Sequence, residues 1–388
     1  MKKLLSLIAA VLFSASIGGP LGAADNFGLK AAEPQAAPVV SAPASLEKVF
    51  AASPDVPTHG YTPSERKSMI GHNTGLEKSA TKSIYLKSLE GQYRPFADYE
   101  KTGYLIMSAD FNFDSGPGKL EMARNLPADA TLVIFASSAD PATKERVLSA
   151  YESVVPRSRI KLIALPNASQ GFWARDGIPV PVFSNAGKFG VVDAVYGHRF
   201  EPDTEIARLF HAGLEKHEFY FEGGNFKANA AGDCLMVNHG AHVKIPDDIF
   251  TSLYGCRQLI RLPFVDGIGH VDEHVSFISD KVIVTDLPEY KDILQGKGFT
   301  VHMLPKPSGP YETYANSLIM DGKVIVPVFG RPTDEQALAV YRSLGLKATG
   351  GSSNTLSNRG QGSLHCITMV YPKVSATELM KALGGKEF

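Results

Sequence analysis

The stretch NSLIMDGKVIVPVFG (residues 316–330) contains two short apolar runs separated by Asp321-Gly322. An Asp-Gly pair between two β-prone runs is typical of a tight hairpin, so two antiparallel strands are expected here. The segment TDEQALAVYRSLG (residues 333–345) follows at once, with the polar start and glycine end of a helix. The order strand, strand, helix predicts an α/β unit in which paired strands precede a helix.

The same order occurs elsewhere in the chain. PVPVFSNAGKFGVVDAV (residues 179–195) predicts a second strand pair, and DTEIARLFHAGL (residues 203–214) predicts the helix after it. The expected strands are 104–111, 131–138, 160–166, 189–196, 281–287 and 323–329, and the expected helices are 141–154, 203–214, 333–345 and 375–385. This alternation predicts an α/β fold made of strand–strand–helix modules rather than one open parallel sheet.

The composition is that of a globular protein. Of the 388 residues, 44% are hydrophobic and 20% are charged, which excludes a wholly disordered chain. The formal net charge is −1, so there is no basic excess of the kind that marks a dedicated nucleic-acid binder. Three cysteines are too few for a disulfide-rich scaffold.

The first 24 residues have the pattern of a secretory signal peptide. Lys2 and Lys3 precede an apolar stretch over residues 4–17, and small residues then lead to a cleavage point before Asp25. That stretch is shorter than the roughly 20 residues that a spanning helix needs. We therefore expect a secreted or periplasmic protein without stable membrane insertion after cleavage, with an uncleaved anchor as the alternative.

Three further regions follow the expected signal peptide. Residues 25–60 are rich in Ala and Pro and are expected to form a disordered linker, because they contain few large apolar side chains to bury. Residues 61–94 are expected to be an N-terminal extension packed on the main domain. Residues 95–388 are expected to form that domain.

Four segments place polar groups in apolar surroundings, and they are the candidate sources of chemistry. They are GFWARDGIPVPVF (171–183), FYFEGGNFKAN (219–229), DGIGHVDEHVSFISDKVIVTD (266–286) and GQGSLHCITMVYP (360–372).

The run HVDEHVSFI (residues 270–278) has the β-branched and aromatic residues of a strand. In a strand, His270, Asp272 and His274 would share one face and could point together into a site. In a helix, His270 and His274 would have the spacing of a zinc pair, but the H-E-x-x-H pattern is absent, so no metal site is predicted. A polar strand face at the surface is the alternative.

Cys366 lies in a strand-like run. A cysteine in such a run is more often a packing residue than a nucleophile. However, Cys234 and Cys256 could form a disulfide and leave Cys366 as a free thiol in an exported protein, which favours a chemical use. On a strand its neighbour His365 would face the opposite side, so His270 is the better candidate base.

Asp176 and Glu222 add acidic groups to the set. Taken alone, Asp176 could simply pair with Arg175, and Glu222 could be an ordinary loop residue. Taken together, the four segments supply a thiol, an imidazole and three carboxylates. Two carboxylates can bind the N–H fork of a planar guanidinium, and a thiolate can add to its central carbon.

Four motifs occur in a consistent order: WARD followed by Gly-x-Pro, then FEGGN, GHVDE and GSLHCIT. With these motifs the chain resembles the guanidine-modifying superfamily, in particular its bacterial peptidylarginine deiminase and agmatine deiminase branch, over roughly residues 95–388. The resemblance implies a five-bladed α/β propeller of ββαβ modules with pseudo-fivefold symmetry. It also implies that residues 95–388 are a deiminase catalytic domain.

The resemblance implies a role for each polar residue of the four motifs. Cys366 would be the nucleophile and His270 the general acid and base. Asp176 and Asp272 would clamp the guanidinium nitrogens, and Glu222 would hold His270 in orientation.

Three further residues are expected to contact the substrate. Trp173 would pack along its stem, Asn316 in the run YANSLIM would shape the site, and Arg199 would lie near the mouth. Relatives that prefer a C-terminal arginine use arginines after the W-x-R-D segment to hold the peptide carboxylate. Here that region reads VYGHRFEPD (195–203), with His198 and a single arginine, and this departure weakens the case for carboxylate-directed specificity.

The implied reaction is hydrolytic deimination through a covalent thiouronium intermediate on Cys366, with release of ammonia. No cofactor or metal is required, and no acidic loop of the calcium-binding type stands out. The export signal and the wording of the GHVDE motif favour peptidyl- or protein-arginine as substrate, with citrulline as product. The alternatives are an agmatine deiminase, a thiol hydrolase of peptide or amide bonds, and an inactive secreted propeller that binds arginine-bearing partners.

Overall fold

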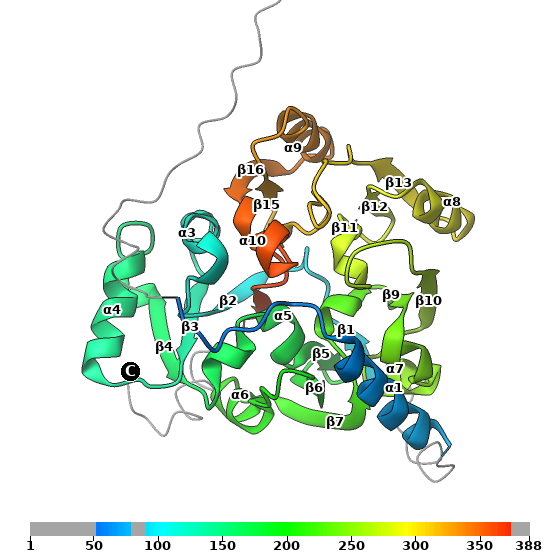
Figure 1. The fold of residues 1–388 in the computed structure, drawn as a ribbon, viewed down its shortest axis with the longest axis horizontal. Helices are drawn as coiled ribbons and strands as arrows, with labels where there is room; N and C mark the ends of the chain where they lie inside the picture. The colour runs from blue at the N-terminus through cyan, green and yellow to red at the C-terminus, as the bar shows by residue number, and fades with distance from the viewer. Residues whose placement is uncertain (1–51, 79–90, 374–388) are drawn as a thin grey trace, which may run out of the picture. The chain divides into compact units, whose positions relative to one another are not determined.

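The computed structural model describes residues 52–78 and 91–373, which form an α/β fold with five separate β-sheets (Figure 1). The strands are, by sheet, β1 (Tyr93–Pro95), β5 (Val180–Ser184), β6 (Phe189–Val195) and β7 (Gly213–Tyr220) in sheet A; β17 (Met369–Pro372), β2 (Thr102–Ser108), β3 (Thr131–Ala136) and β4 (Ile160–Ala164) in sheet B; β10 (Gln258–Pro263), β9 (Asp233–Asn238) and β8 (Lys227–Ala228) in sheet C; β11 (Val275–Phe277), β12 (Val282–Thr285) and β13 (Thr300–Met303) in sheet D; and β14 (Leu318–Met320), β15 (Lys323–Val328) and β16 (Lys347–Ser352) in sheet E. The α-helices are α1 (Pro63–Glu77), α3 (Gly116–Arg124), α4 (Pro141–Tyr151), α5 (Ala174–Gly177), α6 (Asp203–Leu209), α7 (Asp247–Ser252), α8 (Pro288–Gly296), α9 (Asp334–Ser343) and α10 (Asn354–Gly360).

The expected strand–strand–helix module is confirmed in sheet E. Leu318 of β14 pairs antiparallel with Ile325 of β15. Asp321 and Gly322 form the turn between the two strands with φ values of 46° and 75°, the left-handed conformation that a type I′ hairpin requires. After α9 the chain returns as β16, parallel to β15.

The same module recurs in three more sheets. In each, an antiparallel strand pair is followed by a helix and then by a strand parallel to the second member of the pair: β5, β6, α6 and β7 in sheet A; β8, β9, α7 and β10 in sheet C; and β11, β12, α8 and β13 in sheet D. The repeat that the sequence suggests is therefore a structural one. A closed arrangement of the five sheets as a propeller stays a prediction.

Sheet B is completed by the two ends of the described domain. Near the C-terminal end, Met369 of β17 pairs antiparallel with Ile106 of β2. The strands β2, β3 and β4 then run parallel, with α3 and α4 between them. The side chains of β2 alternate between two buried clusters, since Leu105 lies in one and Ile106 in the other. This explains why the strand is apolar on both faces.

Of the other strand and helix predictions that fall on described residues, three differ from the structure: those over 203–214, over 270–278 and around Cys366, the last of which is described with the site. The helix expected over 203–214 ends at Leu209, because His211 has a φ of 51° and Gly213 already starts β7, opposite Gly190. The strand expected over 270–278 starts only at Val275, as described below. The helix expected over 375–385 and the signal peptide lie outside the described residues, as does most of the expected linker.

The last part of the expected linker is packed on the domain rather than disordered. Residues 53–61, which we call the strap, run along α5 to α1 and precede α1 as the blue trace in the middle of Figure 1. Asn112 exchanges two hydrogen bonds with the backbone of Ser53, at 3.0 and 2.8 Å. Thr62 and Glu65 form a capping box that starts α1. Disorder was predicted from the low content of large apolar residues, but hydrogen bonds to the domain are the main contacts that hold this segment.

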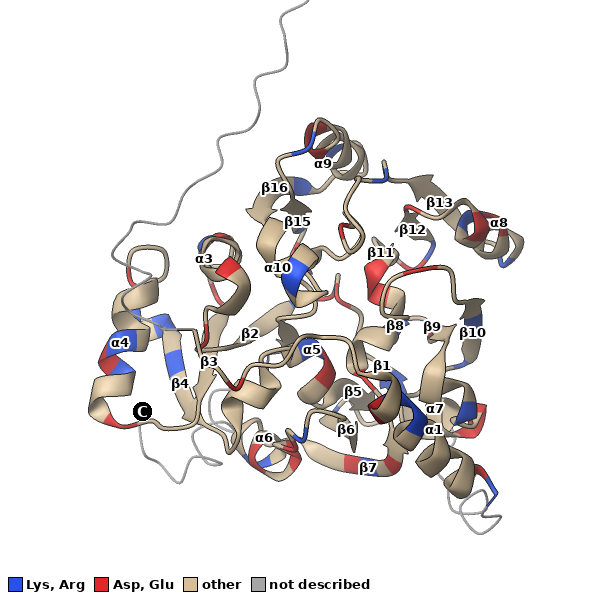
Figure 2. Cartoon of the chain, viewed as in Figure 1, with Lys and Arg blue, Asp and Glu red and all other residues tan. Residues whose placement is uncertain are grey.

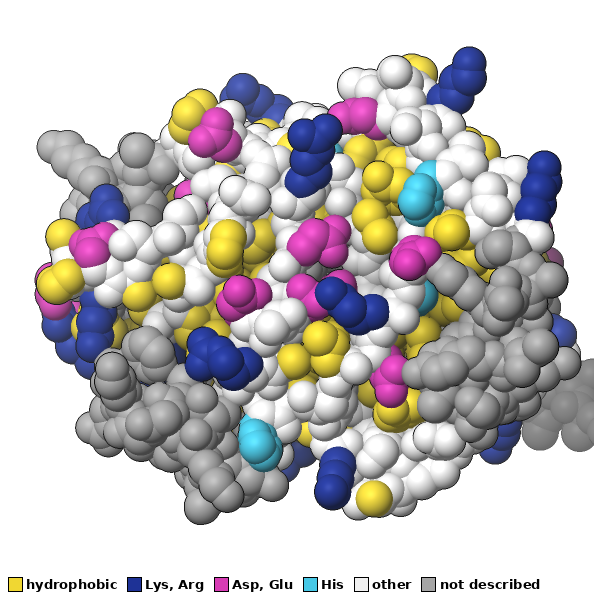
Figure 3. Space-filling view, turned by 90° about the horizontal axis from the view of Figure 1, so that it is seen from below, with side chains coloured by type: hydrophobic (Ala, Val, Ile, Leu, Met, Phe, Trp, Pro, Cys, Tyr) yellow, Lys and Arg dark blue, Asp and Glu magenta, His cyan; other side chains and the backbone are white. Residues whose placement is uncertain are grey.

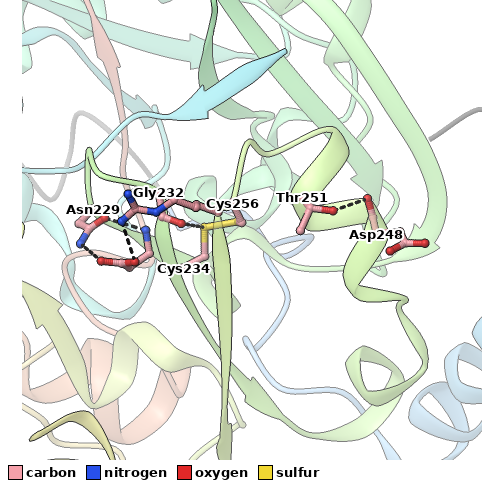
Figure 4. The surroundings of a disulfide bond; sticks show 8 residues. Asn229, Gly232, Cys234, Asp248, Thr251 and Cys256 are labelled. Carbon is pink, nitrogen blue, oxygen red and sulfur yellow. Dashed lines mark hydrogen bonds and ion pairs between the residues drawn. A yellow bond between two sulfur atoms is a disulfide. The ribbon is translucent and has the colours of Figure 1, made fainter. Parts of the chain in front are cut away.

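The expected pairing of Cys234 and Cys256 is present as a disulfide, which joins the start of β9 to the segment before β10 (Figure 4). We expect that replacing both cysteines by serine lowers the free energy of unfolding by about 3 kcal/mol, because the bond closes a loop of 22 residues in the unfolded chain. Thermal unfolding measures the loss. Titration of the unreduced, denatured protein should find one free thiol, and three would contradict the pairing.

Acidic and basic residues are mixed over the surface. Both signs occur on the outer helices α4 and α9 (Figure 2). One face of the molecule also carries both signs, with several acidic side chains near its middle (Figure 3). Among the described residues, no helix combines the length and the apolar character needed to cross a bilayer.

Candidate active site

Five of the candidate site residues lie just before a strand that pairs antiparallel with a neighbouring strand of its sheet. Asp176 precedes β5, Glu222 precedes β8, Asp272 precedes β11, Asn316 precedes β14 and Cys366 precedes β17. Because the same point of each module carries the functional side chain, residues far apart in the sequence meet in one place.

Gly224 marks the point where three of these side chains converge. Its N–H donates to Asp176 Oδ1 at 2.9 Å. A Cβ atom at this position would lie 2.7 Å from His270 Nδ1, 2.8 Å from Asp176 Oδ1 and 3.3 Å from Asp272 Oδ1. Only glycine leaves room at this position, so the Gly-Gly pair noted in the sequence has a steric reason.

Cys366 is buried in a turn before β17, not in the strand that the sequence predicts. Its Sγ lies 3.7 Å from Asp272 Oδ2 and 3.1 Å from Asn316 Nδ2. Asn316 also donates to the backbone oxygen of Asp272 at 3.1 Å. Asn316 was expected to shape the site. Its side chain links the turn that carries Cys366 to the turn that carries Asp272 through these hydrogen bonds.

The turn also changes the position of His365, which the sequence analysis placed on the far side of a strand. His365 Nδ1 lies 2.6 Å from Asp272 Oδ2, and its Nε2 lies 3.0 Å from Asp98 Oδ2. Lys227 Nζ donates to Asp98 Oδ2 at 2.6 Å. His365, Asp98 and Lys227 thus form a largely buried hydrogen-bond network with Asp272, which the sequence analysis did not include.

His270 lies between two carboxylates. Its Nδ1 is 3.7 Å from Asp176 Oδ1, and its Nε2 is 3.7 Å from Glu222 Oε2. Glu222 makes a closer contact with the imidazole of His242, which the sequence analysis did not include. The expected support of His270 by Glu222 is therefore shared with a second histidine.

The segment around His270 is a 3₁₀ turn over Val271–Glu273, and β11 starts after it. The carboxylate of Glu273 accepts the backbone N–H groups of Ile268, Gly269 and His270 at 3.1–3.2 Å. This local capping outweighs the β preference of the run. The prediction that His270, Asp272 and His274 share a strand face is wrong.

His274 does not belong to the site. It forms ion pairs with Asp266 and Asp286 at 2.7 and 2.8 Å. The group that could hold a metal is instead His59, Asp176 and His270, whose ligand atoms lie within 4.8 Å of one another. Two imidazoles and a carboxylate suit Zn²⁺, but His59 Nε2 hydrogen bonds directly to Asp176 Oδ2, so the contact needs no ion to account for it.

Trp173 and Arg199, both expected to contact substrate, have different positions. Trp173 is fully buried at the start of α5, and the ring of His59 stacks on it with 4.3 Å between centroids and 10° between planes. Arg199 is exposed in a turn with a φ of 61°, and it is its neighbour His198 that bonds the strap, at the backbone oxygen of His59.

The electrostatics of the site favour the charged forms of Glu222 and Asp272 and the protonated form of the Cys366 thiol, through the direction of each pKa shift. Burial raises the pKa of the Cys366 thiol, and the charges of Asp272 and Asp176 raise it further. Burial alone would lower the pKa of His270, but Asp176, Glu222 and Asp272 outweigh it and raise the value to about 10. Burial opposes ionisation of Asp272, yet its bond to His365 lowers the pKa to about 2.

These pKa directions predict how Cys366 reacts with an uncharged alkylating reagent. Since the thiolate fraction grows with pH and the pKa is raised, the alkylation rate should be low at neutral pH and should still rise over about pH 7–10. The measurement is the rate of iodoacetamide labelling of Cys366, located by mass spectrometry. A rate that levels off below about pH 8 would mean that the free protein already holds a thiolate.

Two kinds of site residue escaped the sequence analysis. Lys227 and His365 lie inside the quoted segments, next to residues that were chosen, so proximity to them was a usable signal. His59 and Asp98 lie in stretches without a motif, and only the fold brings them to the site.

The chain matches a known protein family and resembles proteins of known fold. A model of the Porphyromonas-type peptidyl-arginine deiminase family matches residues 119–372. Agmatine deiminase from Pseudomonas fluorescens is 23% identical over 327 residues, which cover 63% of this chain and 88% of that protein.

Solved structures share the fold. C. jejuni agmatine deiminase has a TM-score of 0.60 at 20% identity, covering 73% of this chain and 96% of that one. Agmatine deiminase of Enterococcus faecalis has a TM-score of 0.58 at 17% identity, covering 73% and 96%. At such identities these structures establish the fold alone, while the family match spans all the residues from Asp176 to Cys366.

Proposed function

Because the chain belongs to the Porphyromonas-type peptidyl-arginine deiminase family, and is thus a hydrolase of C–N bonds in guanidine compounds, we propose that Cys366 and His270 carry out its deimination reaction. The single observation that carries the proposal is the convergence of Asp176, His270 and Asp272 around Gly224, beside the Cys366 thiol.

Substrate binding in this proposal relies on charge and planarity. A guanidinium stays protonated and presents a planar fork of N–H donors. Asp176 and Asp272 supply the two carboxylates, and Asp272 Oδ1 is buried with no hydrogen-bond partner among the described residues. A donor of the guanidinium would satisfy that oxygen, and the indole face of Trp173 would stack on the cation.

The chemical step follows from the protonation states of the free protein. Entry of the cation neutralises the carboxylates that raise the pKa of Cys366, so the thiol loses its proton to solvent. The thiolate adds to the guanidinium carbon. His270, already an imidazolium, gives its proton to the departing nitrogen, and the C–N bond breaks to release ammonia.

The intermediate is a thiouronium bound to Cys366. Neutral His270 then takes a proton from water as the water oxygen adds to the same carbon. The C–S bond breaks, the new hydroxyl loses its proton, and the ureido product leaves with the thiolate regenerated. Glu222 and His242 position His270 for both proton transfers.

Two guanidine substrates are candidates. The relatives named as agmatine deiminases support agmatine more directly than they support peptidyl-arginine. The family description, the expected export signal and the motif wording support arginine within a peptide or protein. Both present the same reacting group to the same residues.

The experiment that tests the function incubates the purified protein with agmatine and with a blocked arginine peptide. We expect ammonia together with N-carbamoylputrescine or citrulline. Cleaved peptide without citrulline would instead support a thiol hydrolase, and binding without product would support an inactive arginine-binding protein.

Two further proposals accompany the function. We propose that residues 1–24 direct export, so that the mature protein starts at Asp25 outside the cytoplasm, which N-terminal sequencing of the exported protein would test. We also propose that the five sheets are the blades of an α/β propeller, because each sheet repeats the same strand arrangement and each supplies a residue to one site.

A further inference from the structure

The strap crosses the candidate active site, bound mainly through its backbone. Trp173 Nε1 donates to the backbone oxygen of Pro57 at 3.0 Å, and the His59 N–H donates to the Gly360 oxygen at 2.9 Å. Gln361 Oε1 accepts the Gly60 N–H at 3.3 Å. The bonding groups therefore come from Trp173, just before α5, and from the end of α10, which lie shortly before Asp176 and Cys366 in the chain.

His59 points from the strap into the site. Its side chain is buried, its ring lies parallel to that of Trp173, and it meets the His270 ring edge to face at 5.2 Å. A planar nitrogen ring stacked on an indole and bonded to a carboxylate makes the contacts that a guanidinium would make.

Both carboxylate oxygens of Asp176 already have a hydrogen-bond partner. Asp176 Oδ1 accepts the Gly224 N–H, and Oδ2 bonds His59 Nε2. Because the His59 ring also covers the Trp173 indole, a guanidinium that stacks on Trp173 and binds Asp176 Oδ2 must displace His59. The strap and a substrate cannot occupy this carboxylate together.

The backbone contacts indicate which kind of substrate would replace the strap. Amide and carbonyl groups on both sides of His59 are bound by Trp173, His198 and the Gly360–Gln361 segment. Such groups exist in any polypeptide and are absent from agmatine. A site that binds these backbone groups while a planar side chain enters it fits an arginine within a peptide chain.

We propose that residues 53–61 are an intramolecular pseudosubstrate: they occupy the binding site of an arginine-bearing polypeptide and place His59 where its guanidinium binds. This inference rests on the proposed deimination function. His59 precedes the region matched by the family model, so the pseudosubstrate lies in the N-terminal segment of this chain, outside the matched residues.

The first test compares the wild-type protein with His59→Ala. We expect kcat/KM for a blocked arginine peptide to rise about tenfold or more, because a segment that fills the site nine-tenths of the time weakens apparent binding about tenfold. In the variant, the peptide should also exceed agmatine in kcat/KM. His72→Ala is the matched control, since His72 is an exposed histidine on α1 outside the site, and it should leave both values unchanged.

Three outcomes of this comparison overturn the inference. A fall in kcat/KM for His59→Ala would show that His59 takes part in catalysis or substrate binding. No change would show that His59 does not compete with the substrate. A preference of the variant for agmatine would show that the site occupied by residues 53–61 does not bind a polypeptide substrate.

A second variant turns the strap into a substrate. In His59→Arg, the longer side chain should bring its guanidinium to Cys366 and be converted to citrulline, as detected by mass spectrometry of the peptide containing residue 59. His59→Arg combined with Cys366→Ala should keep its arginine. An arginine that stays unmodified in the His59→Arg protein, while that protein deiminates added guanidines, would overturn the inference.

A binding experiment distinguishes failure of the proposed deimination function from failure of the pseudosubstrate inference. If no variant deiminates any guanidine, the pseudosubstrate is judged by binding alone. In the Cys366→Ala background, His59→Ala should bind an arginine peptide about tenfold more tightly than the parent by calorimetry. Equal affinities would overturn the inference whether or not the protein is an enzyme.

Discussion

Replacing Cys366 by alanine is expected to lower kcat for any guanidine substrate by on the order of 10⁴-fold or more, as removal of the nucleophile does in enzymes with covalent intermediates. The thiol is buried beside Asp272 and Asn316, and among the described residues no other cysteine is free to replace it. The carboxylates stay in place, so the variant should still bind substrate. Ammonia release measures the first effect and calorimetry the second.

Two comparisons make the Cys366 result specific. Cys366→Ser should be almost as inactive, because a serine hydroxyl is far harder to ionise than a thiol. Removal of the Cys234–Cys256 disulfide, which lies at β9 and β10 rather than in the site, should leave kcat nearly unchanged. If Cys366→Ala retains a tenth of the wild-type rate, the covalent mechanism is wrong.

The sequence predicted the fold at the level of its modules. Asp321-Gly322 fixes one hairpin locally, and the helix that follows needs no information from the rest of the chain. Sheet B could not be predicted this way. Its outer pair joins Met369 to Ile106, and nothing in either local sequence specifies a partner so far along the chain.

The sequence predicted the chemistry of the site better than its geometry. Asp176, Asp272 and Cys366 were chosen because charged or reactive groups in apolar runs need a reason, and the structure buries all three. The local backbone of Asp272 and of Cys366 was misjudged, because turns fixed by side-chain capping, such as that of Glu273, resemble strands in composition.

His59 shows the limit of reasoning from composition. The Ala- and Pro-rich stretch before it predicts little burial, and none of its described residues, 52–58, is fully buried. The strap is held by hydrogen bonds to Trp173, Gly360 and Asn112, which depend on partners from other segments. Composition indicates how much apolar surface a segment can bury, but it does not indicate which backbone groups will find hydrogen-bond partners in other segments.

Replacing Asp272 by asparagine is expected to cost about 3–5 kcal/mol in kcat/KM, a loss of roughly a hundredfold to several thousandfold. Asp272 Oδ2 accepts from His365 at 2.6 Å, and Oδ1 is the buried oxygen offered to the guanidinium. Asparagine keeps the shape but removes the charge. It also turns one position from acceptor to donor, so either His365 or the substrate faces an N–H group instead of an oxygen.

Asp286→Asn is the matched control for this change, because Asp286 is also a buried aspartate that contacts a histidine, and it directly follows β12 of the same module. Asp286 Oδ1 lies 2.8 Å from His274 Nδ1, away from the site. Both variants lose a buried charge beside an imidazole and should be destabilised to a similar degree by thermal unfolding. Only Asp272→Asn should lose activity beyond a few-fold. An equal loss in both would trace the effect to folding, and near-normal activity of a folded Asp272→Asn would remove Asp272 from the guanidinium clamp.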